Sequence, residues 1–307
     1  MVVDDKTILI TGCGSFAKAF ANQILLHHKP KKIIFLSRDE FFQVLAREEV
    51  ADPKGLTRWF IGDVRDYTRL LKALKGVDIV IHTAALKRIE VNEYNPFEAI
   101  MTNIFGTQNV IDACIERGVE QAVLLSTDKA VEPINLYGAT KLCAEKIWID
   151  ANYFKPVFSV VRYGNVMGSR GSVLPKFQEL AQAKKEFPVH DIRMTRFWVS
   201  LEDAVKMVLE VKEYAKIYIL KARSFRIVDL AKALYARAKI KETGIEPGEK
   251  VHEVLIGMGE GVTDEGWYYV VHQDRIFLDG DKPVVKGPKV LSSEFNTMSI
   301  KEIRELL

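Results

Sequence analysis

Tyr137 and Lys141 stand four residues apart in the stretch NLYGATKL. On a helix this spacing places both side chains on one face. A nearby ammonium stabilises a phenolate, so we expect Lys141 to lower the pKa of Tyr137. Such a tyrosine can take a proton from a substrate hydroxyl while a hydride leaves the adjoining carbon. Taken alone, this spacing is common by chance and is more typical of an exposed pair on a helix surface.

Four residues just upstream add a second group of candidates. Ser126 and Thr127 end an apolar run, and Asp128 and Lys129 follow at once. An adjacent carboxyl and amine can act as acid and base if burial and neighbouring cations keep the amine neutral. An exposed turn can carry the same pair, so its meaning depends on the elements around it.

A glycine pattern near the start of the chain indicates a bound dinucleotide. Gly12, Gly14 and Ala17 form G-x-G-x-x-A between a β-branched run and a helical one. Glycines let the backbone approach a pyrophosphate, which then lies at the helix N-terminus. The turn residues expected at the cofactor are Gly12, Gly14, Ser15, Phe16, Ala17 and Lys18.

The residues after the second apolar run bear on the choice between NADP and NAD. Many NAD sites place an acid there for the ribose 2′-hydroxyl, whereas here Ser37 and Arg38 come first. A guanidinium favours a 2′-phosphate, so the sequence predicts NADP rather than NAD. The rest of the expected cofactor set comprises Asp63, Val64, Ala84, Lys87, Ser126, Tyr137 and Lys141.

Strand-like and helix-like runs alternate along the first half of the chain. This alternation predicts an α/β fold with a doubly wound parallel (Rossmann) sheet and a smaller C-terminal α/β substrate-binding lobe. We assign 1–165 to the dinucleotide domain, with 196–220 returning to it, and 166–195 and 221–307 to the lobe. Expected strands are 6–12, 31–38, 57–64, 77–85, 121–127, 157–165 and 216–220; expected helices are 15–28, 40–50, 67–74, 95–118, 135–154, 174–185, 196–213 and 226–239.

Composition narrows the class of protein. Charged residues make up 28% of the 307 residues and the net charge is only +3, so nucleic acid is not an indicated partner. Three widely spaced cysteines, no signal-peptide pattern and no apolar run near ~18 residues predict a cytoplasmic chain without membrane segments. No histidine or cysteine spacing suggests a metal site.

Taken together, these motifs resemble the extended short-chain dehydrogenase/reductases that act on nucleotide sugars. More narrowly, STDKAVEPINLYGATKL, VRYGNVMGSRGSVLP, DIRMTRFW and PGEKVHE resemble the inverting UDP-N-acetylglucosamine 4,6-dehydratases of bacterial surface-sugar and pseudaminic acid pathways. The likeness spans roughly residues 6–255. The adjacent Thr127, Asp128 and Lys129 mark this subgroup, since retaining dehydratases carry Asp-Glu there and 4-epimerases carry neither pair.

The resemblance implies roles for individual residues. Tyr137, assisted by Lys141, would accept the proton of the carbon 4 hydroxyl during oxidation by NADP⁺. Lys129 would then remove the carbon 5 hydrogen, and Asp128 beside Thr127 would protonate the departing carbon 6 hydroxyl. Residues implied at the UDP-sugar substrate are Lys87, Asn165, Arg170, Ser172, Val173, Arg196 and Glu249.

The sequence departs from the family pattern at two places, and two other functions stay open. The turn TGCGSFAK is one residue shorter than in relatives, and Glu246 stands where relatives usually carry arginine, which leaves the nucleotide open. A UDP-sugar 4-epimerase would not need Asp128 and Lys129. A non-catalytic dinucleotide-sensing protein would need neither this pair nor Tyr137 with Lys141. We expect a homo-oligomer.

Overall fold

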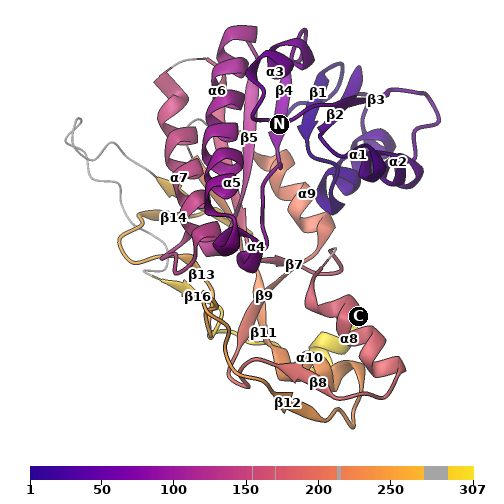
Figure 1. Cartoon of the computed structure of the whole chain (residues 1–307), viewed down its shortest axis with the longest axis vertical. Coiled ribbons are helices and arrows are strands. Elements are labelled where there is room, and N and C mark those ends of the chain that lie inside the picture. The colour runs from indigo at the N-terminus through magenta and orange to yellow at the C-terminus, as the bar shows by residue number, and fades with distance from the viewer. Residues whose placement is uncertain (154, 170, 213–215, 273–289) are drawn as a thin grey trace.

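The computed structural model describes residues 1–307 except 154, 170, 213–215 and 273–289, and its two lobes lie one above the other (Figure 1). The larger lobe is built on a sheet whose neighbours pair in parallel, except that β15 runs antiparallel to both β10 and β14. In spatial order the nine described strands are β14 (Val262–Asp264), β15 (Tyr268–His272), β10 (Lys216–Leu220), β6 (Val157–Tyr163), β5 (Gln121–Thr127), β4 (Ile79–His82), β1 (Thr7–Thr11), β2 (Lys32–Ser37) and β3 (Thr57–Ile61).

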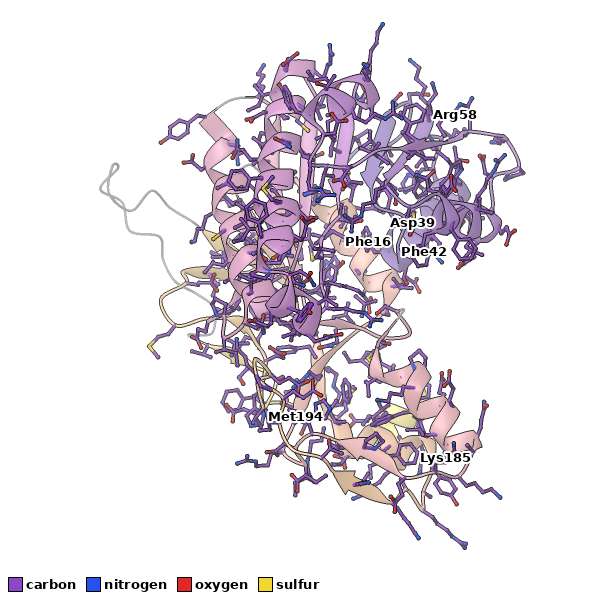
Figure 2. The ribbon with its side chains drawn as sticks, in the orientation of Figure 1. Phe16, Asp39, Phe42, Arg58, Lys185 and Met194 are labelled. Carbon is purple, nitrogen blue, oxygen red and sulfur yellow. The ribbon has the colours of Figure 1, made fainter. Side chains whose placement is uncertain are left out.

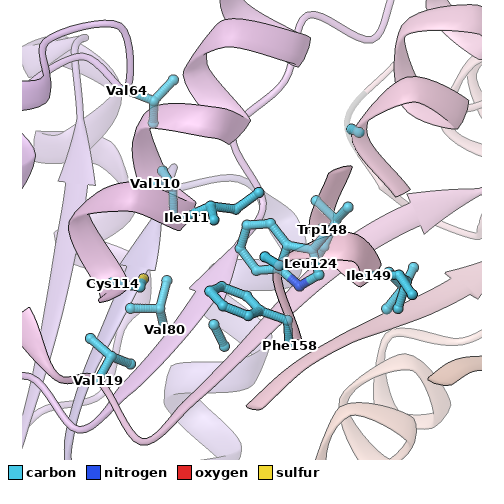
Figure 3. Packing of buried hydrophobic residues seen from close by; sticks show 14 of the residues in the cluster. Val64, Val80, Val110, Ile111, Cys114, Val119, Leu124, Trp148, Ile149 and Phe158 are labelled. Atoms are coloured by element: carbon cyan, nitrogen blue, oxygen red, sulfur yellow. The ribbon is translucent and has the colours of Figure 1, made fainter. Parts of the chain in front are cut away.

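Helices cover both faces of this sheet, which explains why its central strands are apolar throughout rather than alternating. Every residue of β1 is buried. One face packs against α1 (Ser15–His27) and α9 (Leu201–Glu210). The other face packs against α3 (Tyr67–Ala73), α6 (Gly106–Arg117) and α7 (Leu136–Asp150), and Figure 3 shows Trp148 and Phe158 in this core.

The smaller lobe has its own apolar core around Phe177, Phe187 and Phe225. Its helices are α8 (Val173–Gln182), α10 (Ile227–Leu234) and α11 (Ile300–Leu306). Its small sheets pair β7 (Asn165–Val166) and β11 (Arg223–Arg226) with β9 (Thr195–Val199), and β8 (Phe187–Val189) with β12 (Ile240–Glu242). A further pair of short strands, β13 (Val254–Ile256) and β16 (Leu291–Ser292), packs against the core of the larger lobe. The remaining helical segments are α2 (Glu40–Glu49), α4 (Ile89–Tyr94), α5 (Pro96–Ile100), η1 (Met101–Phe105), η2 (Asp128–Ala130) and η3 (Ala151–Tyr153).

The doubly wound sheet is confirmed, but three expected elements differ. The predicted helix 196–213 begins as strand β9, because the helix starts only after Ser200, whose side chain caps it. β9 also pairs within the smaller lobe, whereas α9 packs against the large sheet and β10 pairs within it. β14 and β15 extend that sheet, although the sequence pattern places 221–307 in the lobe. The predicted helix 95–118 is interrupted by a π-turn, η1.

Candidate active site

A cavity of about 1080 Å³ lies at the carboxyl ends of β1, β4, β5 and β6. It includes the point between β1 and β4 where the strand order reverses, the place where doubly wound sheets bind ligands. Residues of the smaller lobe and of the loop 246–249 line its other side. The residues that line it from the sheet side include Gly12, Gly14, Thr83, Ser126, Thr127, Tyr163 and Gly164.

The turn after β1 is shaped for close approach of a pyrophosphate. Gly12 has φ +89, and a Cβ there would lie 2.9 Å from Thr83 Oγ1. Gly14 is the N-cap of α1, no side chain caps the helix, and its first turn carries no acid. The N-cap residue therefore leaves the positive end of the helix dipole uncompensated by a side chain of its own, which fits an anionic dinucleotide.

Not all of the expected turn residues reach the cavity. Ser15, Phe16 and Ala17 line the cavity, as the sequence predicted. Lys18 does not line it; its ammonium pairs with the carboxylate of Glu49 on α2. Figure 2 shows Phe16 and the start of α2 at the end of the sheet that faces the smaller lobe.

The residues expected at the cofactor ribose lie beyond the cavity, at the ends of β2 and β3. Ser37 ends β2, and the half-exposed Arg38 places Nη1 3.7 Å from the carboxylate of Asp63. Asp63 is held by Arg65 at 2.7 Å. Val64 is buried in the core, and Ala84 and Lys87 line the cavity.

The Thr127–Lys129 turn forms a tight hydrogen-bonded cluster. Thr127 Oγ1 donates to Asp128 Oδ1 at 2.9 Å, and Lys129 Nζ lies 3.0 Å from the same oxygen. Asp128 is fully buried, and its Oδ2 atom has no hydrogen-bond partner among the described residues. Helix α7 passes against this turn because Gly138 has no side chain: a Cβ there would lie 2.1 Å from the Lys129 carbonyl oxygen.

A second carboxylate holds Lys129, and sequence reasoning missed it. Glu253 is 2% exposed, and its Oε1 atom lies 3.0 Å from Lys129 Nζ. Burial lowers the pKa of Lys129, but Asp128 and Glu253 outweigh burial and raise it above its ordinary value. The expectation that neighbouring cations keep the Lys129 amine neutral is therefore wrong for this structure.

Burial is the largest influence on the pKa values of the other reactive groups. It raises the pKa of Asp128 above its ordinary value; Lys129 opposes this shift, and Glu253 adds to it. It also raises the pKa of Tyr137 to about 12, with Lys129 opposing. The expected lowering of this pKa by Lys141 is wrong here, since the Lys141 ammonium instead donates to the Leu125 carbonyl at 2.7 Å. Burial lowers the pKa of Lys141 itself to about 8.

Buried polar atoms without hydrogen-bond partners gather at the cavity. Ser126 Oγ, Asn165 Oδ1 and Ser172 Oγ have none among the described residues, and all three side chains line the cavity. Buried polar groups normally find partners, so these atoms are suited to contact a ligand. They are also residues that the sequence selected.

The other expected substrate contacts fall in different places. Glu249 lines the cavity and its carboxylate lies 2.5 Å from His190 Nδ1. Arg196 does not line it; its guanidinium donates to the carbonyls of Thr195 and Val251. Val173 starts α8 and packs against the core of the smaller lobe. Arg170 lies outside the described residues.

Asn103 is a further residue that sequence reasoning missed. It lies in the π-turn η1, and its amide bonds both the N–H and the carbonyl of Leu86, at 2.8 and 2.9 Å. It also donates to Thr140 Oγ1 on α7 at 3.0 Å. Asn103 thus ties the loop that carries Lys87 to the helix that carries Tyr137. A helical pattern gives no signal of a π-turn, so only the structure finds it.

Metal ligands and membrane-spanning helices are both absent from the part of the chain that the structure describes. The described residues contain no group of three or more histidine, cysteine or acidic side chains that could hold a metal ion. None of the helices they form has the length and apolar character needed to cross a membrane.

The sheet, the glycine turn and the Tyr-Lys helix together define an extended short-chain dehydrogenase/reductase. Residues 8–272 match the family described as Polysaccharide biosynthesis protein, and the chain belongs to that family. A UDP-N-acetylglucosamine 4,6-dehydratase (inverting) from Campylobacter jejuni serotype O:2 is 46% identical over 98% of this chain and 97% of its own.

Two further comparisons broaden this relationship. A UDP-glucose 4-epimerase from Rickettsia bellii is 39% identical over 99% of this chain and 95% of its own. The crystal structure of Pen from Bacillus thuringiensis superposes with a TM-score of 0.90 at 35% identity, covering 100% of this chain and 98% of that one. The family resemblance predicted from the sequence is confirmed.

Proposed function

We propose that this protein is an NADP-dependent UDP-N-acetylglucosamine 4,6-dehydratase that inverts carbon 5 and yields a 4-keto-6-deoxy UDP-sugar. The observation that carries the proposal is the Asp128–Lys129 pair, 3.0 Å apart, in the same cavity as Tyr137 and the glycine turn. The name of the Campylobacter relative supports the same reaction and substrate.

Oxidation of the sugar falls to Tyr137 and its helix. A bound nicotinamide dinucleotide supplies the hydride acceptor for carbon 4 and the donor for carbon 6. Tyr137 takes the proton of the carbon 4 hydroxyl. Burial raises the pKa of Tyr137 to about 12, so Tyr137 must lose its own proton before it can act as this base. Arg38 at the end of β2 favours the 2′-phosphate of NADP.

Elimination of water falls to the Asp128–Lys129 pair. The carbon 4 ketone acidifies the carbon 5 hydrogen, which Lys129 removes as a base. Asp128 donates its proton to the departing carbon 6 hydroxyl, and the raised pKa of this buried carboxyl favours the protonated acid that this role requires. Lys87, Asn165, Ser172 and Glu249 supply polar atoms around the sugar and nucleotide.

A UDP-sugar 4-epimerase is the second candidate, because the Rickettsia relative carries that name. It oxidises and reduces carbon 4 without losing water, so it leaves Asp128 and Lys129 unused. Incubating the protein with UDP-N-acetylglucosamine and NADP⁺, followed by mass spectrometry of the nucleotide sugar, separates the two. A product lighter by one water supports the dehydratase, whereas an isomer of unchanged mass supports the epimerase.

A further inference from the structure

Glu253 occupies a position behind Lys129, away from the cavity. It does not line the cavity, whereas Asp128 and Lys129 do. Its Oε1 atom lies 3.0 Å from Lys129 Nζ, and its Oε2 atom is buried without a hydrogen-bond partner among the described residues. Burying a charge is costly unless it is paired, and the partner that this buried carboxylate pairs with is the amine proposed as the base.

Backbone contacts fix this carboxylate in place. The Glu253 N–H donates to Ser293 Oγ at 2.9 Å, and the Ser293 N–H donates back to the Glu253 carbonyl at 2.8 Å. Ser293 Oγ also lies 2.7 Å from Thr195 Oγ1 on β9. The segment near the C-terminal end of the chain thereby anchors Glu253 against the active-site turn.

We propose that Glu253 is a positioning residue of the reaction. From behind Lys129 it holds Nζ beside Asp128, and its negative charge raises the proton affinity of the Asp128–Lys129 pair. The role of Glu253 in elimination rests on the proposed function. Its effect on the pKa of Lys129 can be measured without substrate and does not.

Glu253 matters because one proton must move from Lys129 to Asp128 before elimination can begin. Elimination needs a neutral amine and a protonated acid, whereas the structure places an ammonium 3.0 Å from Asp128. Transfer of one proton from Lys129 Nζ to Asp128 Oδ1 breaks an N–H bond, forms an O–H bond and leaves the total charge unchanged. The Glu253 carboxylate remains beside the pair as a negative charge that raises the pKa of both partners, in addition to the effects of burial and of the pair on each other.

The charged and titratable groups around this pair come from several elements. Asp128 and Lys129 belong to η2, Tyr137 to α7, Arg196 to β9, and Lys250 and Glu253 to the segment before β13. Arg196 Nε lies 3.9 Å from Glu253 Oε1, and with Lys129 it keeps the pKa of Glu253 below its ordinary value against the effect of burial. Glu253 is therefore ionised while Lys129 carries its proton, and Arg196 still favours the carboxylate after Lys129 gives that proton to Asp128.

Glu253→Gln tests the inference because glutamine keeps the shape and removes the charge. Nuclear magnetic resonance titration of ¹³C-lysine-labelled protein, with the Lys129 signal assigned from Lys129→Arg, reads the amine directly and needs no substrate. We expect the Lys129 midpoint to fall by about 1–3 pH units, the usual effect of one charge within 4–6 Å. The pH profile of carbon 5 hydrogen exchange should move to lower pH on both limbs.

Controls separate this role from packing and from the reaction assignment. Glu294→Gln removes an exposed carboxylate from the neighbouring segment and should leave the Lys129 midpoint unchanged. Glu253→Asp keeps the charge but moves it away from Lys129, so the Lys129 midpoint should fall less than in Glu253→Gln. This variant also tests the inference if Glu253→Gln does not fold. An unchanged midpoint in both Glu253 variants overturns the inference. A shifted midpoint in a protein that forms no dehydrated sugar supports Glu253 and rejects the proposed function.

Discussion

Replacing Arg162 by methionine should destabilise the fold strongly, because Arg162 joins three elements around the active site. Its guanidinium bonds Glu145 on α7 at 3.0 and 2.6 Å and Glu260 at 2.8 and 2.9 Å. It also donates to the Leu255 carbonyl of β13 at 3.0 Å. The side chains of Arg162 and Glu145 are 1% and 0% exposed, so solvent cannot replace the lost contacts.

The magnitude follows from what the substitution leaves behind. Glu145 would remain buried without its cation, and breaking a buried ion pair in this way costs about 3–5 kcal/mol of unfolding free energy. Glu260, at 22% side-chain exposure, can be hydrated in part and adds less. Replacing Glu145 by leucine in the same chain removes the unpaired charge, so the double variant should recover most of the loss.

Urea denaturation followed by tryptophan fluorescence measures this loss, since Trp148 is buried on the same helix as Glu145. Arg193→Met is the matched control: Arg193 also bonds a carboxylate through two nitrogens, Asp191, but its side chain is 68% exposed. The control should lose much less stability than Arg162→Met, because solvent reaches the guanidinium side of this pair even though Asp191 itself is mostly buried. A loss below about 1 kcal/mol in Arg162→Met, or no recovery in the double variant, would refute the reasoning, since a broken buried pair costs several times more.

Two further predictions concern the oxidation step. Arg38→Ala should weaken binding of NADP far more than that of NAD, because only NADP carries the 2′-phosphate, and Arg58→Ala should change neither; equal losses for both cofactors in a calorimetric titration would reject Arg38 as the discriminating residue. Tyr137→Phe should retain UDP-sugar binding but lose the transient reduced cofactor in single-turnover absorbance, and a persisting transient would remove Tyr137 from the role of proton acceptor.

The doubly wound sheet and the residues of most of its strands could be predicted from the sequence because the local signals agree. β5 and β10 occupy the expected residues, since short β-branched runs bounded by polar residues leave little choice of register. Two predictions about the elements failed, one for a local reason and one because distant parts of the chain pair in the fold. The pattern merges β9 with the start of α9 because TRFWV continues an apolar run into a helix, and β14 and β15 join the sheet from a distant part of the chain.

The same distinction applies to the site. The glycine turn and the Thr127–Lys129 segment were found because their residues are adjacent in sequence, and they line the cavity together. Glu253 was missed because it lies far along the chain from Lys129 and meets it only through the packing of β13 against η2. The protonation states were mispredicted for a related reason: carboxylates and burial around Lys129 and Tyr137 are properties of the folded chain.

Deuterium incorporation at carbon 5 of the sugar tests the central claim most directly, namely that one cavity serves oxidation through Tyr137 and elimination through Asp128 and Lys129. We expect Lys129→Ala to form reduced cofactor with UDP-N-acetylglucosamine in heavy water but to lose carbon 5 exchange by about 10²–10⁴-fold, the usual effect of removing a general base. Asp128→Asn should retain more exchange while slowing loss of the carbon 6 hydroxyl, and Lys221→Ala, which alters an exposed pair with Asp264, should match the parent. Mass spectrometry of the recovered sugar decides: parent-like deuterium uptake in Lys129→Ala would show that another group is the base and would contradict the account.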